Sequence, residues 1–484
     1  MPGFNLVRNA KVLFTNNLGS DKTVTLTGAT AANTFELQVM NGFSFSQNTE
    51  NQTITVSEAG LAPARGQRAF NTALAPVDFS FTTYIRPKLN GSVTCDEKVL
   101  WNALFSDVAI DGTGTNLTVS AIARTTTTAT TQFTFTSANL STYKVGEIIT
   151  IKGVTDTANP KDWNAPAKIV SSGTVSASGA SLGAAETTLT VAYLVAPGGT
   201  GNPSTTTGTV TLFKGAISQQ TAGTAHLLAH AGRSNVNQLV AFGLVVVFDD
   251  QTYIIDNCSM NQASIDFGLD GIAQIAWSGQ GTVLRQVATT TLNAGTATGG
   301  FAGNYTVGDT TANFITNKLT TTTLSSTFRG AGTGATAYTL AITGGNLTIN
   351  NNISYITPEI MGTVNKPIGY FTGTRAISGN LTAYLKTGSA NTAGLLTALL
   401  AAGSETKYSM GLQIGGSTNS TRVDVDLPAV SLQVPTVETQ DVVSTTINFS
   451  AQTFDGSNSA AANLASANYD LENTNDITLR YYSA

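Results

Sequence analysis

The chain has 484 residues, and only 11% of them are charged, against roughly 25% in an ordinary soluble domain. The formal net charge is -5 and no cluster of Lys or Arg occurs, which excludes a general grip on nucleic acid. No run of about 18 apolar residues occurs, so we expect no insertion into a membrane. Uncharged polar residues favour strands and turns, and a surface poor in charge is typical of one that neighbours cover.

The N-terminus and the cysteines indicate a protein that folds in a cytoplasm. The segment after Met1 has no apolar core long enough for a signal peptide. Cys95 and Cys258 are the only cysteines and allow at most one disulfide, and we expect two reduced, packed thiols.

The first 109 residues predict short strands, one long loop and one helix. Strands are expected at 5–14, 24–26, 35–39 and 41–46. A polar loop over 47–76 follows, and a loop of this length usually has a function. Residues 77–85 alternate between apolar and polar, which predicts a half-buried strand. Asp96 is a suitable N-cap for a helix over 97–106.

The composition changes in the middle of the chain, and the pattern of strands seen before residue 110 then resumes. Residues 110–222 are rich in Thr, Ser, Ala and Gly around several short apolar runs, and they predict an inserted small β-domain, either sandwich or barrel. Residues 238–248 form a nearly continuous apolar strand, and 288–312 read as a linker. We therefore expect a first domain over 1–109 and 223–287 and a second domain over 313–484.

The two expected domains are copies of each other. The strands at 77–85 and 377–385 share their alternation, with Thr82 and Tyr84 matched by Thr382 and Tyr384 at a constant offset of 300. In each copy a short helix follows this strand. Near the end of each copy, residues 263–267 match residues 430–434, and residues 275–277 match residues 447–449. The fold class is thus mainly β, with two tandem sandwich or barrel-like domains that carry one short helix each.

The strand at 377–385 has one dry face and one wet face. Ile377, Leu381 and Leu385 share one parity, whereas Ser378 and Asn380 share the other. A small sheet of this kind leaves open edges, which neighbouring chains can pair. Two similar domains per chain would let three chains form a ring with pseudo-sixfold symmetry, and rings with complementary ends stack into an open filament.

The sequence resembles the major tail tube protein of long-tailed (siphovirus) bacteriophages, in the version with two fused tube domains. The segments that carry the resemblance are VSEAG at 56–60, RGQRAFNTALAPVDFSFTTYIRP at 65–87, CSMNQASIDF at 258–267, AITGGNLTINNNISYITPEIMGTV at 341–364, PIGYFTGTRAISGNLTAYL at 367–385 and PTVETQDVV at 435–443. They cover most of both copies, but neither residues 110–222 nor 288–312.

The resemblance implies a structural subunit of the virion, assembled in the host bacterial cytoplasm. It implies homotrimer rings, stacked into a tube whose inner β-barrel passes viral DNA during ejection. The implied partners are other copies of the chain and the tail tip, tail terminator and tape-measure proteins. No cofactor and no catalytic group is implied.

The sequence assigns three sets of residues to this tube. The polar parities of the paired strands are expected to face the lumen, because hydroxyls, amides and a few carboxylates would not pin phosphates as Lys and Arg would: Asp78, Ser80, Asp266, Ser378, Asn380, Ser431 and Gln433. The dry parities are expected to pack the wall: Phe79, Phe81, Leu381, Ile265 and Leu432. The long loops are expected to contact the next ring: Glu58, Arg65, Arg68, Glu359 and Lys366.

The sequence supports other sites and functions less well than it supports a tube subunit. His226 and His230 would suit a metal only on a helix and with a third ligand, and Asp249–Asp250 suits a turn better than calcium. Asp266, Asp270, Glu438 and Asp441 suggest the paired acids of a glycosidase, but they fall at matching strand ends of the repeat. A β-rich adhesin or carbohydrate-binding protein is the alternative function; it would need an export signal and aromatic platforms.

Overall fold

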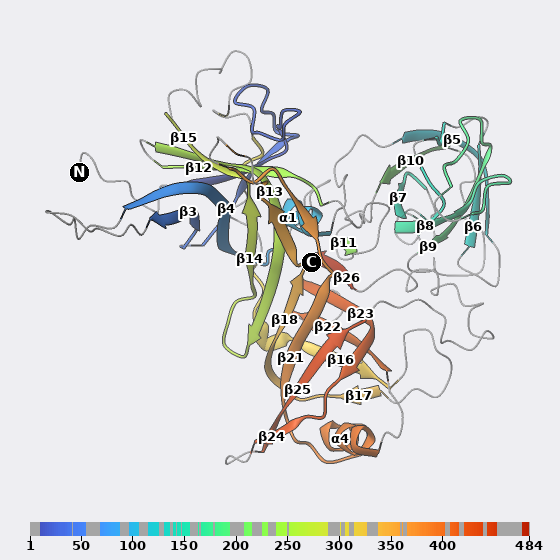
Figure 1. Ribbon diagram of the computed structural model, residues 1–484. Coiled ribbons are helices and arrows are strands. Elements are labelled where there is room, and N and C mark those ends of the chain that lie inside the picture. The colour runs from blue at the N-terminus through green and yellow to red at the C-terminus, as the bar shows by residue number, and fades with distance from the viewer. Residues whose placement is uncertain are drawn as a thin grey trace, which may run out of the picture.

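The computed structural model describes 26 segments of the chain that together hold the sheets and helices discussed below: residues 10–40, 42–54, 68–87, 96–105, 115–124, 130–135, 139–141, 143–146, 148–154, 163, 166–177, 180–193, 208–214, 225–230, 239–248, 251–288, 301, 305–308, 314–326, 337–358, 361, 365–401, 407–415, 421–438, 443–452 and 477–483. Strands dominate these residues, and both α-helices among them are short. The mainly β fold class is confirmed (Figure 1).

One long antiparallel sheet, here called the front sheet, runs through both halves of the molecule (Figure 1). Its strands are hydrogen-bonded in the order β3 (Ser44–Ile54), β4 (Arg68–Tyr84), β14 (Gln274–Gly281), β13 (Gln251–Gly268), β18 (Ile342–Asn350), β21 (Ala376–Tyr384), β25 (Ser444–Ala451) and β24 (Thr436–Glu438). The first four strands belong to the first copy and the last four to the second. The pair β13–β18 therefore joins the two copies.

Each half also has a back sheet. In the first half it contains β2 (Thr34–Leu37), β1 (Lys11–Thr15), β12 (Phe242–Val247), the start of β13 and β15 (Val283–Ala288). In the second half it contains β17 (Ala337–Thr339), β16 (Thr321–Ser325), β22 (Lys407–Ile414), β23 (Arg422–Leu432), β26 (Thr478–Ser483) and β11 (Ala225–His230). The two back sheets thus repeat one strand order, with β11 as an addition.

The strand β13 passes from the back sheet to the front sheet of the first half. Residues 251–256 pair with β12 and β15, and residues 259–268 pair with β14 and β18. Asn257 at the crossing has a φ of 48°, in the left-handed region that asparagine tolerates better than most residues. The strand β23 makes the same passage in the second half, from β22 and β26 to β25.

A single apolar core fills the space between front and back sheets and continues across both halves. The apolar parities of the strands enter it, including Val77, Phe79 and Phe81 of β4, which are buried as the alternation predicts. The strand β12 is buried on both faces, as its continuous apolar sequence predicts.

The helix α1 (Lys98–Phe105) lies in this core, whereas α4 (Thr392–Ala401) lies at the lower end of the molecule (Figure 1). The Trp101 ring meets the Trp277 ring edge-on, and Trp101 Nε1 donates a hydrogen bond of 2.6 Å to the hydroxyl of Tyr481 in the second half. The α4 helix buries only Thr392 and Leu395. The two helices therefore follow equivalent strands but take different positions. Asp96, the expected N-cap of α1, forms an ion pair with Arg86 at 2.7 Å.

The strands between residues 115 and 214 close into a barrel of their own, with a separate core around Trp163 and Tyr193 (Figure 1). The barrel order is β10 (Gly208–Lys214), β5 (Thr115–Arg124), β6 (Thr130–Phe135), β9 (Thr188–Tyr193), β8 (Pro166–Ser171) and β7 (Ile148–Lys152). Of the two architectures that the sequence left open for this stretch, the structure has the barrel.

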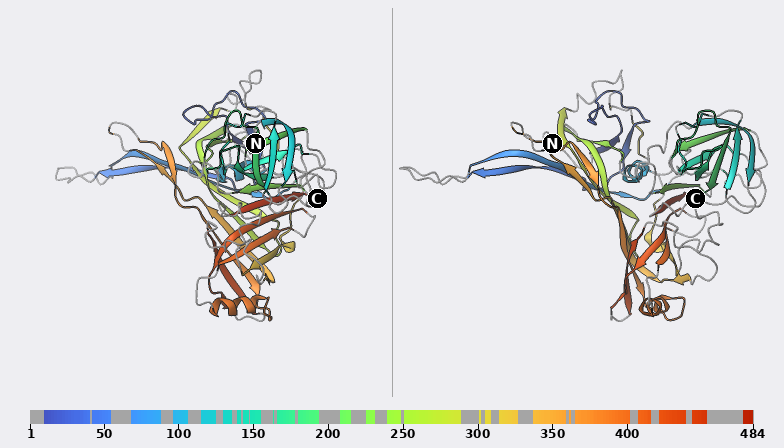
Figure 2. Two further views of the ribbon diagram at one scale, coloured as in Figure 1. Left: turned by 90° about the vertical axis from the view of Figure 1, so that its right-hand side faces the viewer. Right: turned by 45° about the vertical axis from the view of Figure 1, so that its right-hand side comes forward.

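Two sequence expectations are wrong in part. Most of the supposed loop 47–76 is a β-hairpin arm, because β3 continues to Ile54 and β4 begins at Arg68; Figure 2 shows the arm projecting sideways. The segment 288–312 was expected to be a linker, but Thr306 bridges to Phe35 and Phe301 is buried in a cluster with Leu13 and Ile254. The polar composition of both segments gave no sign of these structures in the sequence, because their contacts are made by the backbone and by single side chains.

A polar sheet face as the candidate functional site

The front sheet carries polar side chains on one face across all its strands. The strand registers place these residues in rows that cross the strands. One row reads Thr82, Ala276, Ser264, Thr348, Ser378, Ser450 and Ser431, and the next reads Tyr84, Gln274, Asp266, Asn346, Asn380 and Asn448. A third row reads Ser44, Ser80, Ser278, Gln262 and Asn350. The face is therefore continuous over the join between the two halves.

Neighbouring side chains in these rows hydrogen-bond to one another. The hydroxyl oxygens of Ser44 and Ser80 lie 2.8 Å apart, and those of Ser264 and Thr348 lie 3.1 Å apart across the β13–β18 join. Gln280 Nε2 donates to Asp78 Oδ1 at 2.8 Å. These contacts hold the polar groups in place while leaving many of their lone pairs and protons toward solvent.

The face has no cationic side chain in the rows that the registers define, and its charges are acidic. Asp78 and Asp266 are exposed there. Such a face presents hydroxyls, amides and carboxylates but nothing that binds a phosphate by charge.

The structure places all seven residues that the sequence assigned to a lumen on this face or at its edge. Ser378 and Ser431 lie in the row of hydroxyls, Asp266 and Asn380 in the amide row, and Asp78 and Ser80 on β4. Gln433 follows β23 and accepts a hydrogen bond of 3.3 Å from Asn448.

The opposite face is the apolar one. Phe79, Phe81, Ile265 and Leu381 are each at most 3% exposed, and Leu432 is partly buried against the same core. The face assignments made from alternation therefore agree with the packing.

Sequence reasoning missed about half of the polar face. The missing residues share the alternation of the strands already recognised, and period-two spacing was the signal that would have found them: Ser44, Ser278, Gln280, Asn346, Thr348, Asn448 and Ser450. The registers also shift both repeat matches near the ends of the copies. Trp277 pairs with Phe81 and Ile447 pairs with Leu381, so β14 and β25 correspond at an offset of 170 and not 172. This shift by two keeps every residue on the same face. Ser264 pairs with Ala276 and Thr436 pairs with Thr446, so Ser264 corresponds to Thr436 of β24 and not to Ser431, and the match of 263–267 with 430–434 is wrong.

A hollow of about 330 Å³ opens on the polar face between Ser44, Asp78, Gln280 and Ile353. Its side is closed by Asn261, whose Oδ1 accepts a hydrogen bond from the Ile353 amide at 2.9 Å. The lining combines hydroxyls, amides and the Asp78 carboxylate of this face with the apolar side chains of Phe45, Phe79 and Ile353, so the hollow adjoins the polar surface.

The long loop of the second copy folds back onto the first half through a hairpin of β19 (Ile353–Ile356) and β20 (Gly369–Thr372). The Tyr355 hydroxyl donates toward the carbonyls of Asn257 at 2.8 Å and Gln280 at 2.9 Å, and the Tyr370 hydroxyl donates to the Leu239 carbonyl at 2.9 Å. Burial raises the pKa of the Tyr355 phenol well above its usual value. Two tyrosines thus fix the hairpin beside the β13 crossing.

The outer side of this hairpin and the far end of β14 carry exposed apolar residues. The hairpin set, here called the arm patch, consists of Ile356, Ile368 and Phe371, with Phe70 on β4. The far set, here called the turn patch, consists of Leu269, Ile272, Phe314 and Leu319 around the β13–β14 turn. Tyr355 bonds at Gln280 and the turn precedes Gln274, so the two patches lie at opposite ends of β14.

Of the five residues predicted for contacts between rings, Lys366 is exposed beside Asn365, whose backbone bonds to Thr72 and Leu74 of β4. Arg68 begins β4 and pairs with Ile54. Glu58, Arg65 and Glu359 lie outside the described residues. Part of the second copy's loop therefore contacts its own chain, which the sequence did not reveal.

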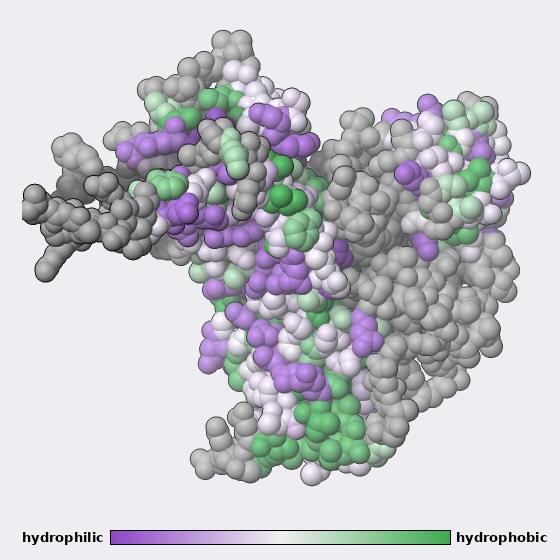
Figure 3. Space-filling view, viewed as in Figure 1, coloured by the Kyte–Doolittle hydropathy of each residue, from purple (hydrophilic) through white to green (hydrophobic). Residues whose placement is uncertain are grey.

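Apolar surface also gathers at the lower end of the molecule, around α4 and the ends of β24 and β25 (Figure 3). Leu400 of α4 and Val437 of β24 are among the exposed large apolar residues there. Patches of this kind on a water-facing surface mark contacts with other molecules.

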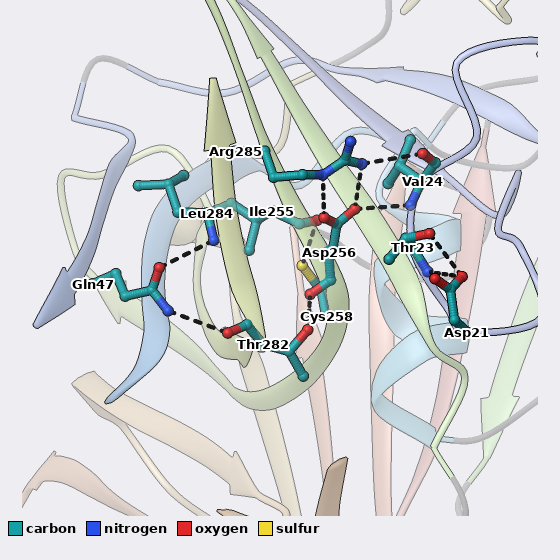
Figure 4. Close-up of polar contacts among 10 residues, drawn as sticks. All are labelled: Asp21, Thr23, Val24, Gln47, Ile255, Asp256, Cys258, Thr282, Leu284 and Arg285. Atoms are coloured by element: carbon teal, nitrogen blue, oxygen red, sulfur yellow. Dashed lines mark hydrogen bonds and ion pairs between the residues drawn. The ribbon is translucent and has the colours of Figure 1, made fainter. Parts of the chain in front are cut away.

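A buried ion pair stabilises the crossing of β13 (Figure 4). Asp256 is 1% exposed, and its carboxylate accepts hydrogen bonds from Arg285 of β15 and, at 2.8 Å, from the amide of Val24. Arg285 Nη2 also donates to the Val24 carbonyl at 3.1 Å. The segment around Val24 is thereby held on the back sheet at the residue where β13 leaves it.

Gln47 makes a second tie near the crossing (Figure 4). Its Nε2 donates to the carbonyls of Ala75 and Thr282, and its Oε1 accepts from the amide of Leu284 at 3.2 Å. The edge strand β3 is thus joined by one side chain to the loop before β15.

The chemistry weighed for other functions finds no support in the described residues. No group of three or more His, Cys, Asp or Glu that could hold a metal occurs among them. His226 and His230 lie on the strand β11, where a separation of four residues spans about 13 Å, so they are not paired as on a helix. Cys258 is a free, buried thiol, as expected, and Cys95 and Asp249–Asp250 lie outside the described residues. Among the parts of the chain described, no helix is long and apolar enough to cross a membrane.

A comparison with known proteins supports the resemblance. The chain is similar to the tail tube protein pb6 of Escherichia phage T5, with 25% identity over 436 residues, which cover 88% of this chain and 69% of that protein. No family model matches. The match confirms the resemblance to siphovirus tail tube proteins, and its coverage extends over both halves of the front sheet.

Proposed function

We propose that the chain is a structural subunit of a phage tail tube and has no catalytic role. In this proposal three chains close into a ring, the rings stack into a hollow tube in the virion, and the tube conducts viral DNA. The similarity to a phage tail tube protein over 88% of the chain supports the structural role. The duplicated architecture supports the ring, because two copies per chain give three chains six similar units.

The observation that carries the proposal is the uninterrupted polar face of the front sheet. The rows defined by strand register hold hydroxyls, amides and carboxylates but neither Lys nor Arg. In a lumen this face would let a polyanion slide, because no cation would exchange for the counterions of the phosphates. The acidic residues Asp78 and Asp266 would repel the backbone and keep it hydrated.

The two apolar patches support stacking of rings. The arm patch and the turn patch lie at opposite ends of β14, so the top of one ring can meet the bottom of the next. Such a contact joins two different surfaces and repeats without closing, which is what a filament needs. The ends of the tube would be completed by tail tip and terminator proteins, with a tape-measure protein inside.

Electron microscopy of the purified chain tests the proposal. Negatively stained samples are expected to contain rings or hollow tubes, alone or after nucleation by a tail tip complex. Persistent monomers under both conditions would contradict the proposal. Monomers that also bind glycans would favour the alternative function, a β-rich surface adhesin or carbohydrate-binding protein.

Lysines on the polar face test the role of that face. A variant with Ser264→Lys, Ser378→Lys and Ser450→Lys is expected to assemble but to retain double-stranded DNA in a salt-dependent manner, and to slow ejection from particles that carry it. The matched control places three lysines at the exposed positions Asn116, Thr118 and Ser120 of the separate barrel. Equal DNA retention by both variants would show that the front-sheet face does not meet DNA.

A further inference from the structure

We propose that β24 of one chain pairs with β3 of the next chain as antiparallel strands, with Val437 opposite Phe45, Thr436 opposite Ser46 and Glu438 opposite Ser44. This rests on the proposed ring and specifies the surface that closes it. Among the described residues β3 pairs only with β4, and β24 pairs only with β25, so each strand has an open edge.

The molecule contains one example of the required contact. At the join between its halves, β13 of the first copy pairs with β18 of the second copy. Ile265 lies opposite Leu347, Ser264 opposite Thr348, and Asp266 opposite Asn346. A ring of equivalent units repeats this join where the second copy of one chain meets the first copy of the next.

The registers identify the counterpart of each residue in the join. Ile265 pairs with Ile275, and Ile275 with Thr83. In the other half Val437 pairs with Thr445, and Thr445 with Ala383. Positions 83 and 383 correspond at the repeat offset of 300, so Val437 takes the place of Ile265.

The same reasoning assigns the partner strand. Leu347 of β18 pairs with Gly379, and Phe45 of β3 pairs with Phe79. Positions 79 and 379 also differ by 300, so Phe45 takes the place of Leu347. Both equivalences were obtained from different strand pairs, and together they fix a single register.

Burial supports the assignment. Ile265 and Leu347 are each 1% exposed in the join, whereas Val437 is 43% exposed at the open edge. Phe45 is only partly buried, beside Phe43 and Tyr253. The pair Ile265 and Leu347 is buried inside the chain, whereas the equivalent residues Val437 and Phe45 lie at the two open edges. Pairing of these edges would cover both side chains at once.

The polar side chains fit the same register. Thr436 and Ser46 correspond to Ser264 and Thr348, whose hydroxyl oxygens lie 3.1 Å apart. Both pairs combine one serine with one threonine. In the same register Glu438 would pair with Ser44, as Asp266 pairs with Asn346 in the join, so no two acidic residues would be paired across the edge.

A disulfide between chains tests the register. Ser46→Cys and Thr436→Cys in one chain place two thiols opposite each other on the accessible polar face, where directly opposed Cβ atoms lie about 4.5–5.5 Å apart, close to the span of a disulfide. Mild oxidation of assembled rings is expected to give covalent trimers on a non-reducing gel. A mixture of the two single variants is expected to give covalent dimers only, which shows that the bond joins different chains.

Three controls define the outcomes. Ser264→Cys with Thr348→Cys should form the equivalent bond inside one chain and leave it monomeric on the gel. Ser44→Cys with Thr436→Cys is displaced by two residues and should cross-link about tenfold more slowly. The wild-type chain reports any bond through Cys95 or Cys258.

The cross-linking result tests the strand register, whereas ring formation tests the proposed function. Rings that form but do not cross-link through positions 46 and 436, or that cross-link faster through 44 and 436, overturn the register and leave the tube role intact. Failure of the unmodified chain to form rings or tubes overturns the proposed function itself.

Discussion

The phenyl ring of Phe79 lies over Gly279 of the neighbouring strand, where a Cβ on that glycine would come within 2.5 Å of the ring's Cζ atom and still closer to the Ser259 carbonyl oxygen. The second half has the same arrangement with the two strands exchanged. There Phe449 of β25 lies over Gly379 of β21, and a Cβ would come within 2.6 Å of the ring. Phe79 corresponds to Gly379, and Gly279 to Phe449. Each half thus has one phenyl ring and one glycine at this site. The packed volume is the same in both halves, although the residue at each of the two positions differs.

This reciprocity predicts that exchanging the two residues costs less than the sum of the two single changes. Phe79→Gly removes a buried ring and should lower the free energy of unfolding by about 3–5 kcal/mol. Gly279→Phe forces a ring against Phe79 and should cost about 1–3 kcal/mol or more. In the double variant the ring at position 279 no longer meets Phe79, but its Cβ still meets the Ser259 carbonyl, so we expect it to recover only part of the summed loss in chemical denaturation.

Gly268 provides the control for this site. It ends β13, and a Cβ there would meet nothing within 4 Å. Gly268→Ala should leave the unfolding transition nearly unchanged, whereas Gly279→Ala should lower it. Equal effects of both alanines would mean that backbone entropy, and not the contacts with the Phe79 ring and the Ser259 carbonyl, explains the glycine.

The sequence predicted faces better than it predicted connections. Alternation in 77–85 and 377–385 assigned Phe79 and Leu381 to the core and Ser80 and Ser378 to the polar face, because a strand has only two faces. The matched strands also revealed the duplication. These are local features, so they are present in the sequence of each strand.

The features that the sequence did not reveal depend on distant partners. The arm formed by residues 47–54 of β3 and 68–76 of β4 is polar, so its β-structure rests on backbone pairing with no apolar alternation to indicate it. The return of Asn365 to β4 and the tyrosine bonds at Asn257 and Gln280 join residues far apart in the chain. The two-residue shift between β14 and β25 kept the same faces and was therefore invisible to the pattern.

A charge on the dry face should prevent folding of the front sheet. Leu381 is 1% exposed and lies between Gly345 and Ile447 of the flanking strands. Leu381→Asp buries an unpaired carboxylate, and we expect a loss of several kcal/mol in the free energy of unfolding and no tubes by electron microscopy. Asn380→Asp adds the same charge on the polar face and should assemble. Tubes of normal length from Leu381→Asp would show that the face assignment is wrong.

Loss of the buried carboxylate at the β13 crossing should release the segment around Val24. Asp256→Asn leaves Arg285 without its ion pair, and Arg285 is about a third exposed, so we expect a loss of about 1–3 kcal/mol. Hydrogen exchange should increase at residues 23–25 before it increases in β14. Asp21→Asn removes an exposed carboxylate from the same segment and is the control, expected to change little. Unchanged exchange in Asp256→Asn would mean that the segment is held by other contacts.

The stability of the first half should fall as the pH rises through the titration of Glu97. Burial raises the pKa of this carboxyl from 4.5 to about 7. The folded state therefore keeps a proton that the unfolded state releases, and the free energy of unfolding should decrease by about 3 kcal/mol between pH 4.5 and pH 7. Glu97→Gln should flatten this dependence in denaturation measured at several pH values. A variant with the wild-type slope would assign the dependence to another group.

Disruption of the arm patch should stop stacking without preventing ring formation. Phe371 is 56% exposed on the outer side of the β19–β20 hairpin, so Phe371→Asp should change the stability of the isolated chain by no more than about 0.5 kcal/mol. Because stacking joins two different surfaces, these rings keep an intact turn patch. We therefore expect single rings from the pure variant and shortened tubes when a minor fraction is mixed with wild-type chains, measured as length distributions in negative stain. Phe371→Leu is the matched control and should give normal lengths. Long tubes from pure Phe371→Asp would exclude the arm patch from the contact between rings.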